Sequence, residues 1–432
     1  MIIDTLNMID GIHHVRTSLE EHKSYIEKLI EGFIDLSRCL EEKKGYLAGI
    51  QARESGKPIK YAEIEVGRCI SQLNHAVIFL KQWILDVSER RKKKRIPLGV
   101  VMAITTFSSP YSSFFHKVIP AIICDDTFVF LPSPKVYRCS EEIFFLTENC
   151  LKKYLPGIEE KIICVNTQQV DSDKVLERVN FKYLLFTGKS KTASYIKKKV
   201  GYCHGLFETG SCAIAYVDKD ISNIDKLARK LVSSAFAQSG MRCIGLKNLF
   251  IQESISRILI EKIVEHTKKV KYGDPLDYEI MVGPVPDSAM LIELEDAIAQ
   301  LRKSDYKVLV GGFVQDNFLL PTVLLDFCSE VYSIKEMYGP ILCIHIVKDF
   351  IEISPIYYER SSLNTAFFSE NAEQIQRFVD YCNTSGTICI NCGPDRRDDG
   401  VPFGGFFDEN EGKEDLQTLI GELSREQRII YE

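Results

Sequence analysis

One cysteine and two carboxylates have sequence surroundings that suit a reactive site. Cys243 lies in the stretch AFAQSGMRCIG between Gly240 and Gly245, where a glycine-rich backbone can approach a ligand closely. Glu208 lies in LFETGS and Glu336 in KEMYGP, each beside a turn. A thiolate can act as a nucleophile and a carboxylate can move protons for it. Taken alone, a buried inert thiol and two turn carboxylates explain these residues better than catalysis does.

Other common catalytic motifs are missing from the sequence. There is no P-loop, no G-x-G-x-x-G after a strand, no H-E-x-x-H and no G-x-S-x-G. The eight histidines show no ligand spacing, and the C-x-x-C pair of Cys389 and Cys392 lacks the second pair of a zinc site. The fourteen cysteines lie mostly in apolar runs, as buried reduced thiols do. We therefore expect no metal, and a chemistry of thiol and carboxylate groups.

The elements that must position these groups follow an alternating pattern. Helical periodicity covers residues 20–55 and 60–87, and Gly56 and Pro58 separate the two stretches. Short β-branched runs then alternate with helical stretches. These runs are PLGVVMAIT, DDTFVFLPS, IICVN, YLLFTG, CAIAYVD, NLFIQ and the residues near 307–311 and 341–347, with further helices at 253–271 and 286–303. Strands alternating with helices predict an α/β protein with two interleaved lobes on parallel sheets.

Composition narrows the class of protein further. The 432 residues are too many for one ordinary core. With 54 basic and 60 acidic residues the net charge is −6, which disfavours nonspecific nucleic-acid binding. Charges interrupt every apolar run before the roughly 20 residues that a membrane helix needs, and MIIDTLNMIDG has acids where a signal peptide has basic residues. We expect a soluble cytoplasmic protein that binds neither nucleic acid nor membrane.

The order of the segments resembles the aldehyde dehydrogenase superfamily from about Gly32 to the C-terminus. The matching segments are ESGKPIKYAEIEV, RIPLGVVMAIT with FSSP, DDTFVFLPS, FTGKS, FETGS, GMRC, GDPLD, LPTVL, KEMYGP and VPFGG. Each segment is weak evidence alone, but together in family order they are specific. FETGSCA and RRDDGVPFGG are most similar to the lactaldehyde and non-phosphorylating glyceraldehyde-phosphate dehydrogenase branch.

The resemblance implies a domain organisation. It predicts an α/β fold of two interleaved Rossmann-like parallel-sheet lobes with a small β-ribbon arm for oligomerisation. Residues 1–87 and 99–208 would form the dinucleotide-binding domain, and residues 209–420 the catalytic domain. Residues 88–98 and 421–432 would form the arm, through which family members assemble as homodimers or homotetramers.

The resemblance also implies a reaction, the NAD(P)-dependent oxidation of a small aldehyde to a carboxylic acid. Cys243 would attack the aldehyde, giving a thiohemiacetal and then a thioester. Glu208 would act as general base for the water that hydrolyses the thioester. The backbone N–H of Cys243 and the side chain at position 108 would hold the oxyanion.

Further residues acquire roles only through the resemblance. Glu336 would hold the nicotinamide ribose, with Tyr338 in place of the family phenylalanine. The other implied cofactor-binding residues are Gly188, Lys189, Ser190, Thr105, Pro132 and Ser133. Phe107 and Tyr111 would line the substrate pocket, which favours an apolar or small aldehyde.

The chain departs from the family at several of these positions. Ser108 stands where the family has its oxyanion asparagine, and Leu131 and Pro134 stand where it has a cofactor lysine and glutamate. One hypothesis is a working dehydrogenase with relaxed cofactor contacts, in which Lys135 and Lys189 meet a phosphate and favour NADP over NAD. The alternative is a degenerate member, with weak or no catalysis, that is kept for binding or assembly. Surface solvation is the simpler interpretation of both lysines.

Overall fold

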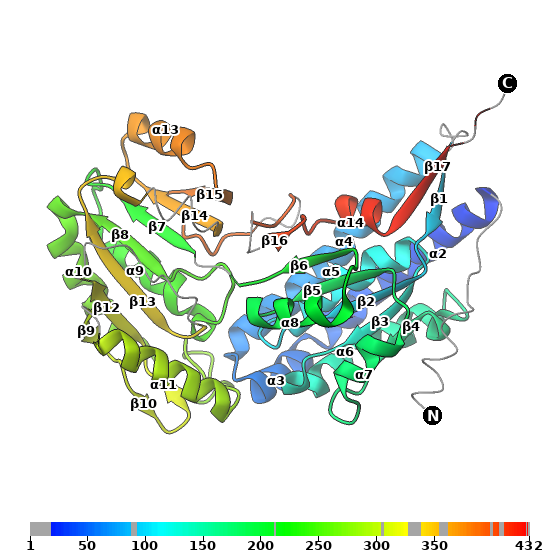
Figure 1. Ribbon diagram of the computed structural model, residues 1–432, viewed down its shortest axis with the longest axis horizontal. Helices are drawn as coiled ribbons and strands as arrows, with labels where there is room; N and C mark the ends of the chain where they lie inside the picture. The colour runs from blue at the N-terminus through cyan, green and yellow to red at the C-terminus, as the bar shows by residue number, and fades with distance from the viewer. Residues whose placement is uncertain are drawn as a thin grey trace.

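The computed structural model describes residues 19–87, 93–210, 213–303, 306–326, 338–353, 362–397, 401–405, 410–428 and 430. Figure 1 shows two α/β lobes side by side, one built around β2–β6 and the other around β7–β15. The chain passes from the first lobe to the second after β6 and returns to the first at β16. The expected fold class, two interleaved lobes on parallel sheets, is confirmed.

The first lobe has a six-stranded sheet in the order β16-β6-β5-β2-β3-β4, parallel except for β16. Its strands are β2 (Val100–Ile104), β3 (Thr127–Leu131), β4 (Ile162–Cys164), β5 (Tyr183–Thr187), β6 (Gly205–Glu208) and β16 (Asn410–Glu411). Its helices are α2 (Leu19–Glu42), α3 (Lys44–Ser55), α4 (Ile59–Val87), α5 (Pro110–Ile123), α6 (Tyr137–Lys152), α7 (Ser172–Arg178), α8 (Ser190–Val200) and α14 (Leu416–Glu422). Alternate β2 side chains enter different cores, because Val101 and Ala103 face the α4–α6 side while Val100 and Met102 face α7 and α8.

The second lobe has a seven-stranded sheet in the order β15-β14-β7-β8-β13-β12-β9. Its strands are β7 (Ile214–Val217), β8 (Asn248–Gln252), β9 (Tyr306–Val310), β12 (Thr322–Asp326), β13 (Ile341–Val347), β14 (Ser362–Phe368) and β15 (Ser385–Ile390), with a hairpin of β10 (Val314–Gln315) and β11 (Phe318–Leu319). Its helices are α9 (Ile224–Phe236), α10 (Glu253–Thr267), α11 (Ser288–Lys303) and α13 (Ala372–Tyr381). The edge strand β9 runs antiparallel to β12, and the other pairings in this sheet are parallel.

The N-terminal helices differ from the sequence expectation in one detail. The stretch 20–55, expected as one helical segment, divides at Lys43 into α2 and α3. Gly56 ends α3 with φ 73°, and a Cβ there would lie 2.1 Å from the carbonyl oxygen of Pro284, so only glycine fits this stop. Among the helices that the structure describes, none has the length and apolar character to cross a membrane.

The two-stranded ribbon forms where the arm was expected, but the C-terminal boundary of the catalytic domain differs from the expectation. β1 (Lys93–Pro97) pairs antiparallel with β17 (Ser424–Arg428) in a two-stranded ribbon, inside the ranges expected for the arm. The catalytic domain was expected to run to residue 420, but β16 pairs with β6 and α14 belongs to the first lobe. The reason is burial, since Leu419 and Ile420 join the core around α5.

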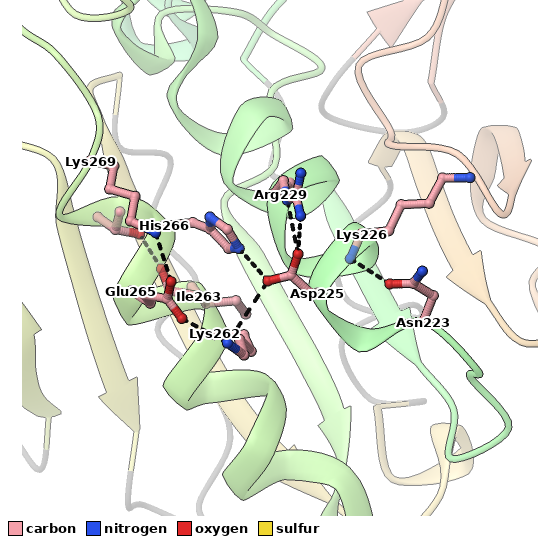
Figure 2. A network of polar contacts seen from close by, with 10 residues as sticks. Asn223, Asp225, Lys226, Arg229, Lys262, Ile263, Glu265, His266 and Lys269 are labelled. Atoms are coloured by element: carbon pink, nitrogen blue, oxygen red, sulfur yellow. Dashed lines mark hydrogen bonds and ion pairs between the residues drawn. The ribbon is translucent and has the colours of Figure 1, made fainter.

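An ion-pair network joins α9 and α10 on the second lobe. Figure 2 shows Asp225 of α9 in contact with Arg229 on the same helix and with His266 of α10, whose Nε2 lies 2.8 Å away. The Asn223 side chain begins α9 by accepting a hydrogen bond from the backbone N–H of Lys226 at 2.9 Å. Such part-exposed ion pairs contribute at most about 1 kcal/mol each, so the network adds only modestly to the packing of α9 against α10.

Candidate active site

A cavity of about 800 Å³ lies at the carboxyl ends of β2, β3, β5 and β6 and takes its walls from both lobes. This is the edge at which parallel α/β sheets bind their ligands, and the volume is ample for a small-molecule site. Cys243, Glu208 and Ser108 all line it. The structure thus brings together the three residues expected to be catalytic from distant parts of the sequence.

A left-handed turn precedes Cys243. The 3₁₀ helix Ala237–Gly240 follows α9, and Gln238, Ser239 and Gly240 have φ values of 58°, 59° and 64°. A Cβ on Gly240 would lie 2.2 Å from the carbonyl oxygen of Gly339, so glycine is required there. Non-glycine residues in this conformation are strained and are typical of functional sites. The turn presents Cys243, half-buried, to the cavity.

A buried lysine that the sequence analysis missed supports this turn. Lys247 is almost fully buried, and its ammonium group donates to the carbonyl oxygen of Gly240 and to that of Gly339 at 3.2 Å. Ser239 adds two further links, from its N–H to the Met281 carbonyl at 3.1 Å and from the N–H of Gly283 to its Oγ at 2.9 Å. The strained conformation is therefore held from several sides.

The thiol of Cys243 is protonated at neutral pH in this arrangement. Burial and the nearby Glu208 raise its pKa to about 12, against the opposing influence of Arg397, Arg242 and Arg68. Formation of the thiolate therefore depends on changes in charge around the sulfur.

Glu208 ends β6 at the cavity wall and is almost fully buried. The hydroxyl of Thr187 lies 3.3 Å from its Oε2. Burial and the neighbouring carboxylate of Glu414 raise the pKa of Glu208 to about 7, while Lys117 and Arg397 act in the opposite direction. A carboxyl group with such a pKa can both accept and release a proton near neutral pH, as a general base requires.

Glu414, Lys117 and Arg397 form a buried charge cluster behind Glu208. Lys117 Nζ lies 3.1 Å from Glu414 Oε1, and Arg397 Nη2 lies 3.2 Å from Glu414 Oε2. Burial opposes the ionisation of Glu414, but the positive charges of Lys117 and Arg397 outweigh it and hold its pKa well below the usual range. The carboxylate of Glu414 therefore stays ionised and keeps a negative charge beside Glu208.

His116 completes the cluster as an acceptor. Its Nε2 lies 2.9 Å from Arg397 Nη2 and 2.6 Å from Gln72 Nε2, both of which can only donate. Nε2 therefore carries no proton. Burial and the positive charge of Arg397 lower the pKa of His116 to about 3, in agreement with a neutral ring. No local sequence pattern marks this cluster, because its members come from three separate segments of the chain.

Ser108 lies in the turn before α5 and is tied to its surroundings. Its Oγ lies 3.3 Å from Thr106 Oγ1, and its carbonyl oxygen accepts a hydrogen bond from Gln238 Nε2 at 3.0 Å. Glu65 holds the start of α5 by accepting from the backbone N–H of Ser112 at 3.1 Å. The turn that carries Ser108 is thus fixed to the turn that precedes Cys243.

The structure supports one of the two expected pocket residues. Phe107 lines the cavity, but Tyr111 does not, and its side chain is fully buried in the first-lobe core. The Tyr111 hydroxyl donates to the carbonyl oxygen of Leu47 at 2.8 Å. The expectation for Tyr111 was wrong because its place on α5 directs the ring to α3 rather than to the cavity.

The cavity has several features that fit a nicotinamide dinucleotide. Thr105, at the end of β2, lines the cavity, and its buried hydroxyl has no hydrogen-bond partner among the residues that the structure describes. A Cβ on Gly188 would lie 2.7 Å from the Phe186 ring, which keeps the backbone before α8 open. Ser190 is the first residue of α8, and a helix N-terminus at this edge of a sheet attracts phosphate. The residues present fit the group at these points.

The other expected cofactor residues are distributed as follows. Lys189, Pro132, Ser133 and Tyr338 line the cavity, whereas Glu336 lies outside the described residues. Leu131 and Pro134 also line the cavity and offer no polar side chain there.

Carboxylates of the second lobe engage the two lysines expected at a phosphate. Lys135 forms an ion pair with Asp287, just before α11, and Lys189 forms one with Glu293 on α11. A bound phosphate would therefore compete with these carboxylates. The proposed contact of either lysine with a phosphate stays a prediction.

Comparison with known proteins agrees with the geometry. The lactaldehyde dehydrogenase of Methanocaldococcus jannaschii is 28% identical over 409 residues, covering 94% of this chain and 88% of that protein. The sulfoacetaldehyde dehydrogenase of Neptuniibacter caesariensis is 26% identical over 337 residues, covering 77% of this chain and 72% of that protein. The glyceraldehyde-3-phosphate dehydrogenase GapN from M. jannaschii, solved in complex with NADP, superposes with a TM-score of 0.85 at 26% identity, covering 99% of this chain and 92% of that one.

The match extends over nearly the whole chain. Residues 24–428 match the sequence profile of the aldehyde dehydrogenase family. The relatives named above confirm the lactaldehyde and glyceraldehyde-3-phosphate dehydrogenase branch that the motifs indicated. The protein is a member of the aldehyde dehydrogenase family of oxidoreductases.

Proposed function

We propose that the protein oxidises an aldehyde to a carboxylic acid, with NADP or NAD as the hydride acceptor. One observation carries the proposal: Cys243 and Glu208 share a single cavity with the unsatisfied hydroxyl of Thr105. A thiol, a carboxyl with a pKa near neutrality and an unpartnered polar group at the sheet edge are what thioester chemistry beside a dinucleotide requires. Thr105, Gly188 and the start of α8 would hold the cofactor, which supplies an acceptor for hydride.

Cys243 forms the bond to the substrate. Its thiolate attacks the aldehyde carbon, and the carbonyl electron pair moves onto oxygen. Donors in the wall stabilise this oxyanion, and the backbone N–H of Cys243 is one of them. Loss of hydride from the carbon leaves a thioester on Cys243.

Glu208 then activates water. Its carboxylate takes a proton as the water attacks the thioester carbon, and the acid product leaves as the sulfur departs. The charge cluster of Glu414, Lys117 and Arg397 supports this role, because it leaves Glu208 with a pKa near the working pH.

The cavity wall favours an aldehyde that carries a negative group. Arg68, Arg242 and Arg397 line the cavity, and all three influence the charge state of Cys243. Asp395 holds Arg242 in place with two hydrogen bonds. Arg242 Nη1 donates to Asp395 Oδ2 at 3.0 Å, and Nη2 donates to the Asp395 carbonyl oxygen at 2.7 Å. The apolar or small aldehyde expected from the sequence stays a prediction, and the arginines favour one that also carries a negative group. The name of one relative, a sulfoacetaldehyde dehydrogenase, is in keeping with it.

The test is titration of the protein with NADP and NAD, followed by thermal unfolding, and then assay with matched neutral and anionic aldehydes. Binding to the native state alone raises the unfolding temperature by mass action. We expect stabilisation by NADP at lower concentration than by NAD, and a higher kcat/KM for the anionic aldehyde that falls with salt. No stabilisation by either nucleotide would contradict the proposal.

A degenerate scaffold is the second candidate. It is favoured by Leu131 and Pro134 in the cavity wall, and by the engagement of Lys135 and Lys189 with Asp287 and Glu293. In that case neither nucleotide would stabilise the protein, and Cys243 would show no selective reactivity.

We also propose that the protein assembles as a homodimer or homotetramer through the β1–β17 ribbon. Within the described residues these two strands pair only with each other, and an isolated two-stranded ribbon is marginally stable in water. Its free edges therefore favour pairing with another copy. Light scattering of the full chain would measure the mass of the assembly.

A further inference from the structure

The oxyanion site lacks an amide at position 108, but an amide from another segment, that of Gln238, contacts the backbone carbonyl of Ser108. Gln238 is almost fully buried, lines the cavity with Cys243 and donates from Nε2 to the Ser108 carbonyl at 3.0 Å. A carbonyl oxygen only accepts, so the amide nitrogen must face Ser108. We propose that Gln238 is a catalytic residue that supplies the side-chain donor for the oxyanion formed on Cys243, an inference that rests on the proposed function.

The chemistry of the amide allows this role. An NH₂ group has two hydrogens, and the bond to Ser108 uses one of them. The second hydrogen lies in the same amide plane, and Gln238 lines the same cavity as Cys243. The Ser108 hydroxyl, by contrast, has Thr106 Oγ1 as a neighbour at 3.3 Å and sits on a shorter, freely rotating side chain. Of the two, Gln238 is the better preorganised donor.

The backbone of Gln238 supplies an independent reason. Gln238 and Ser239 both adopt left-handed conformations with φ near 60°, although neither is glycine. The N–H of Met241 bonds to the Gln238 carbonyl at 3.0 Å, which closes the turn that leads to Cys243. A strained conformation persists where the surroundings enforce it, and it is commonly kept where it aims a functional group. Here the strain directs the Gln238 amide toward Ser108 and the cavity.

Two reactions of Cys243 separate an oxyanion donor from a residue that only positions the thiol. With p-nitrophenyl acetate, the thiolate attacks the ester carbon, an oxyanion forms, and p-nitrophenolate leaves as the acetyl-thioester is made. With iodoacetamide, the thiolate displaces iodide from carbon and no oxyanion forms. Both reactions proceed without cofactor, so neither readout depends on turnover.

The test compares both rates in wild type, Gln238→Met and Ser239→Ala. We expect Gln238→Met to slow acetylation about 10²–10³-fold, the usual effect of losing one such donor, and to change alkylation less than threefold. Ser239→Ala loosens the same turn and changes the two rates alike. If Gln238→Met folds poorly by thermal unfolding, Gln238→Leu removes the donor without adding a charge and serves instead. Adding Ser108→Asn to Gln238→Met restores an amide and recovers acetylation at least tenfold.

Two results overturn the assignment in different ways. If acetylation slows no more than alkylation in Gln238→Met, Gln238 is not an oxyanion donor, and the proposed function is unaffected. If peptide mapping of the wild type shows no acetyl group on Cys243, the proposed function fails and the assignment fails with it.

Discussion

The ammonium nitrogen of Lys117 lies 3.1 Å from Glu414 Oε1, although 297 residues separate them along the chain. Both side chains are almost entirely buried, and Lys117 also donates to Thr187 Oγ1 at 2.7 Å. The pair joins α5, which follows the turn of Ser108, to the segment that returns to the first lobe. It also lies directly behind Glu208. One ion pair therefore connects the stability of the returning segment with the protonation of the catalytic carboxyl.

Lys117→Met should destabilise the protein strongly. It leaves the buried carboxylate of Glu414 with Arg397 as its remaining ion-pair partner among the described residues. Breaking a buried pair typically costs about 3–5 kcal/mol, and we expect a loss near the lower end, measured by urea unfolding. Lys153→Met is the matched control, because Lys153 pairs with Asp35 at 3.0 Å on the surface and should cost less than about 1 kcal/mol. Equal losses from both substitutions would contradict the argument.

The steady-state rate should fall with acid around neutral pH. Glu208 works as a base only when ionised, and its pKa is raised to about 7. As the pH falls through that value, Glu208 takes up a proton and thioester hydrolysis slows. The kcat profile should therefore have an acid limb near pH 7, where a solvent-exposed glutamate would give one near pH 4.5. Lys117→Met removes a positive charge that favours ionisation, so its limb should move to higher pH.

Glu208→Gln should separate the two halves of the reaction. The variant should release one equivalent of reduced cofactor in a burst and then stall at the thioester, because no base activates water. Rapid-mixing absorbance measures the burst, and mass spectrometry identifies the acyl group on Cys243. Steady turnover at the wild-type rate would remove Glu208 from the mechanism.

Much of the frame follows from local sequence. The β-branched runs around Val100–Ile104 and Thr127–Leu131 predict two central strands of the first sheet, and both form. Gly56 stops α3 as expected, because a side chain there would collide with Pro284. The roles of Cys243 and Glu208, by contrast, came from the order of motifs, since neither residue differs in type from a structural one.

The charge cluster of Glu414, Lys117 and Arg397 could not be predicted from the sequence, for a physical reason. Lys117 lies in a helix with an apolar core face and Glu414 in an acidic tail, so each has the local pattern of an ordinary surface residue. Only the return of the chain through β16 buries them together. Tyr111 shows the opposite error, since an aromatic beside a catalytic turn was assigned to the pocket while its helix directs it into the core.

Removal of the Glu208 charge should make Cys243 more reactive. Burial and then Glu208 raise the thiol pKa to about 12, so a neutral amide at 208 lowers it and increases the thiolate fraction at any pH below it. If the thiol pKa falls by about half to one, the thiolate fraction at pH 8 rises about three- to tenfold, and alkylation by iodoacetamide becomes faster by the same factor. Peptide mapping should show the gain at Cys243 and no gain at Cys203, which lies outside the cavity. A slower alkylation in Glu208→Gln would mean that Glu208 activates the thiol directly.

The charge of Asp287 should influence the choice between NADP and NAD. Lys135 forms an ion pair with Asp287, whose Oδ1 also begins α11 by accepting from the N–H of Met290 at 2.8 Å. Asp287→Asn keeps that cap but removes the charge that competes for Lys135. If Lys135 contacts the additional phosphate of NADP, the variant should bind NADP about tenfold more tightly. This change corresponds to about 1.4 kcal/mol of binding free energy, a modest gain for one freed charge near a surface.

NAD serves as the ligand control, and two further variants of the chain serve as protein controls. NAD lacks the additional phosphate, so its affinity should stay within twofold. Glu295→Gln removes the same charge from an exposed position of α11 that does not line the cavity, and should leave both affinities unchanged. Lys135→Met should weaken NADP alone. Fluorescence titration measures all four proteins. If Asp287→Asn tightens NAD and NADP equally, Lys135 acts on a phosphate common to both nucleotides, and the preference for NADP must come from another residue.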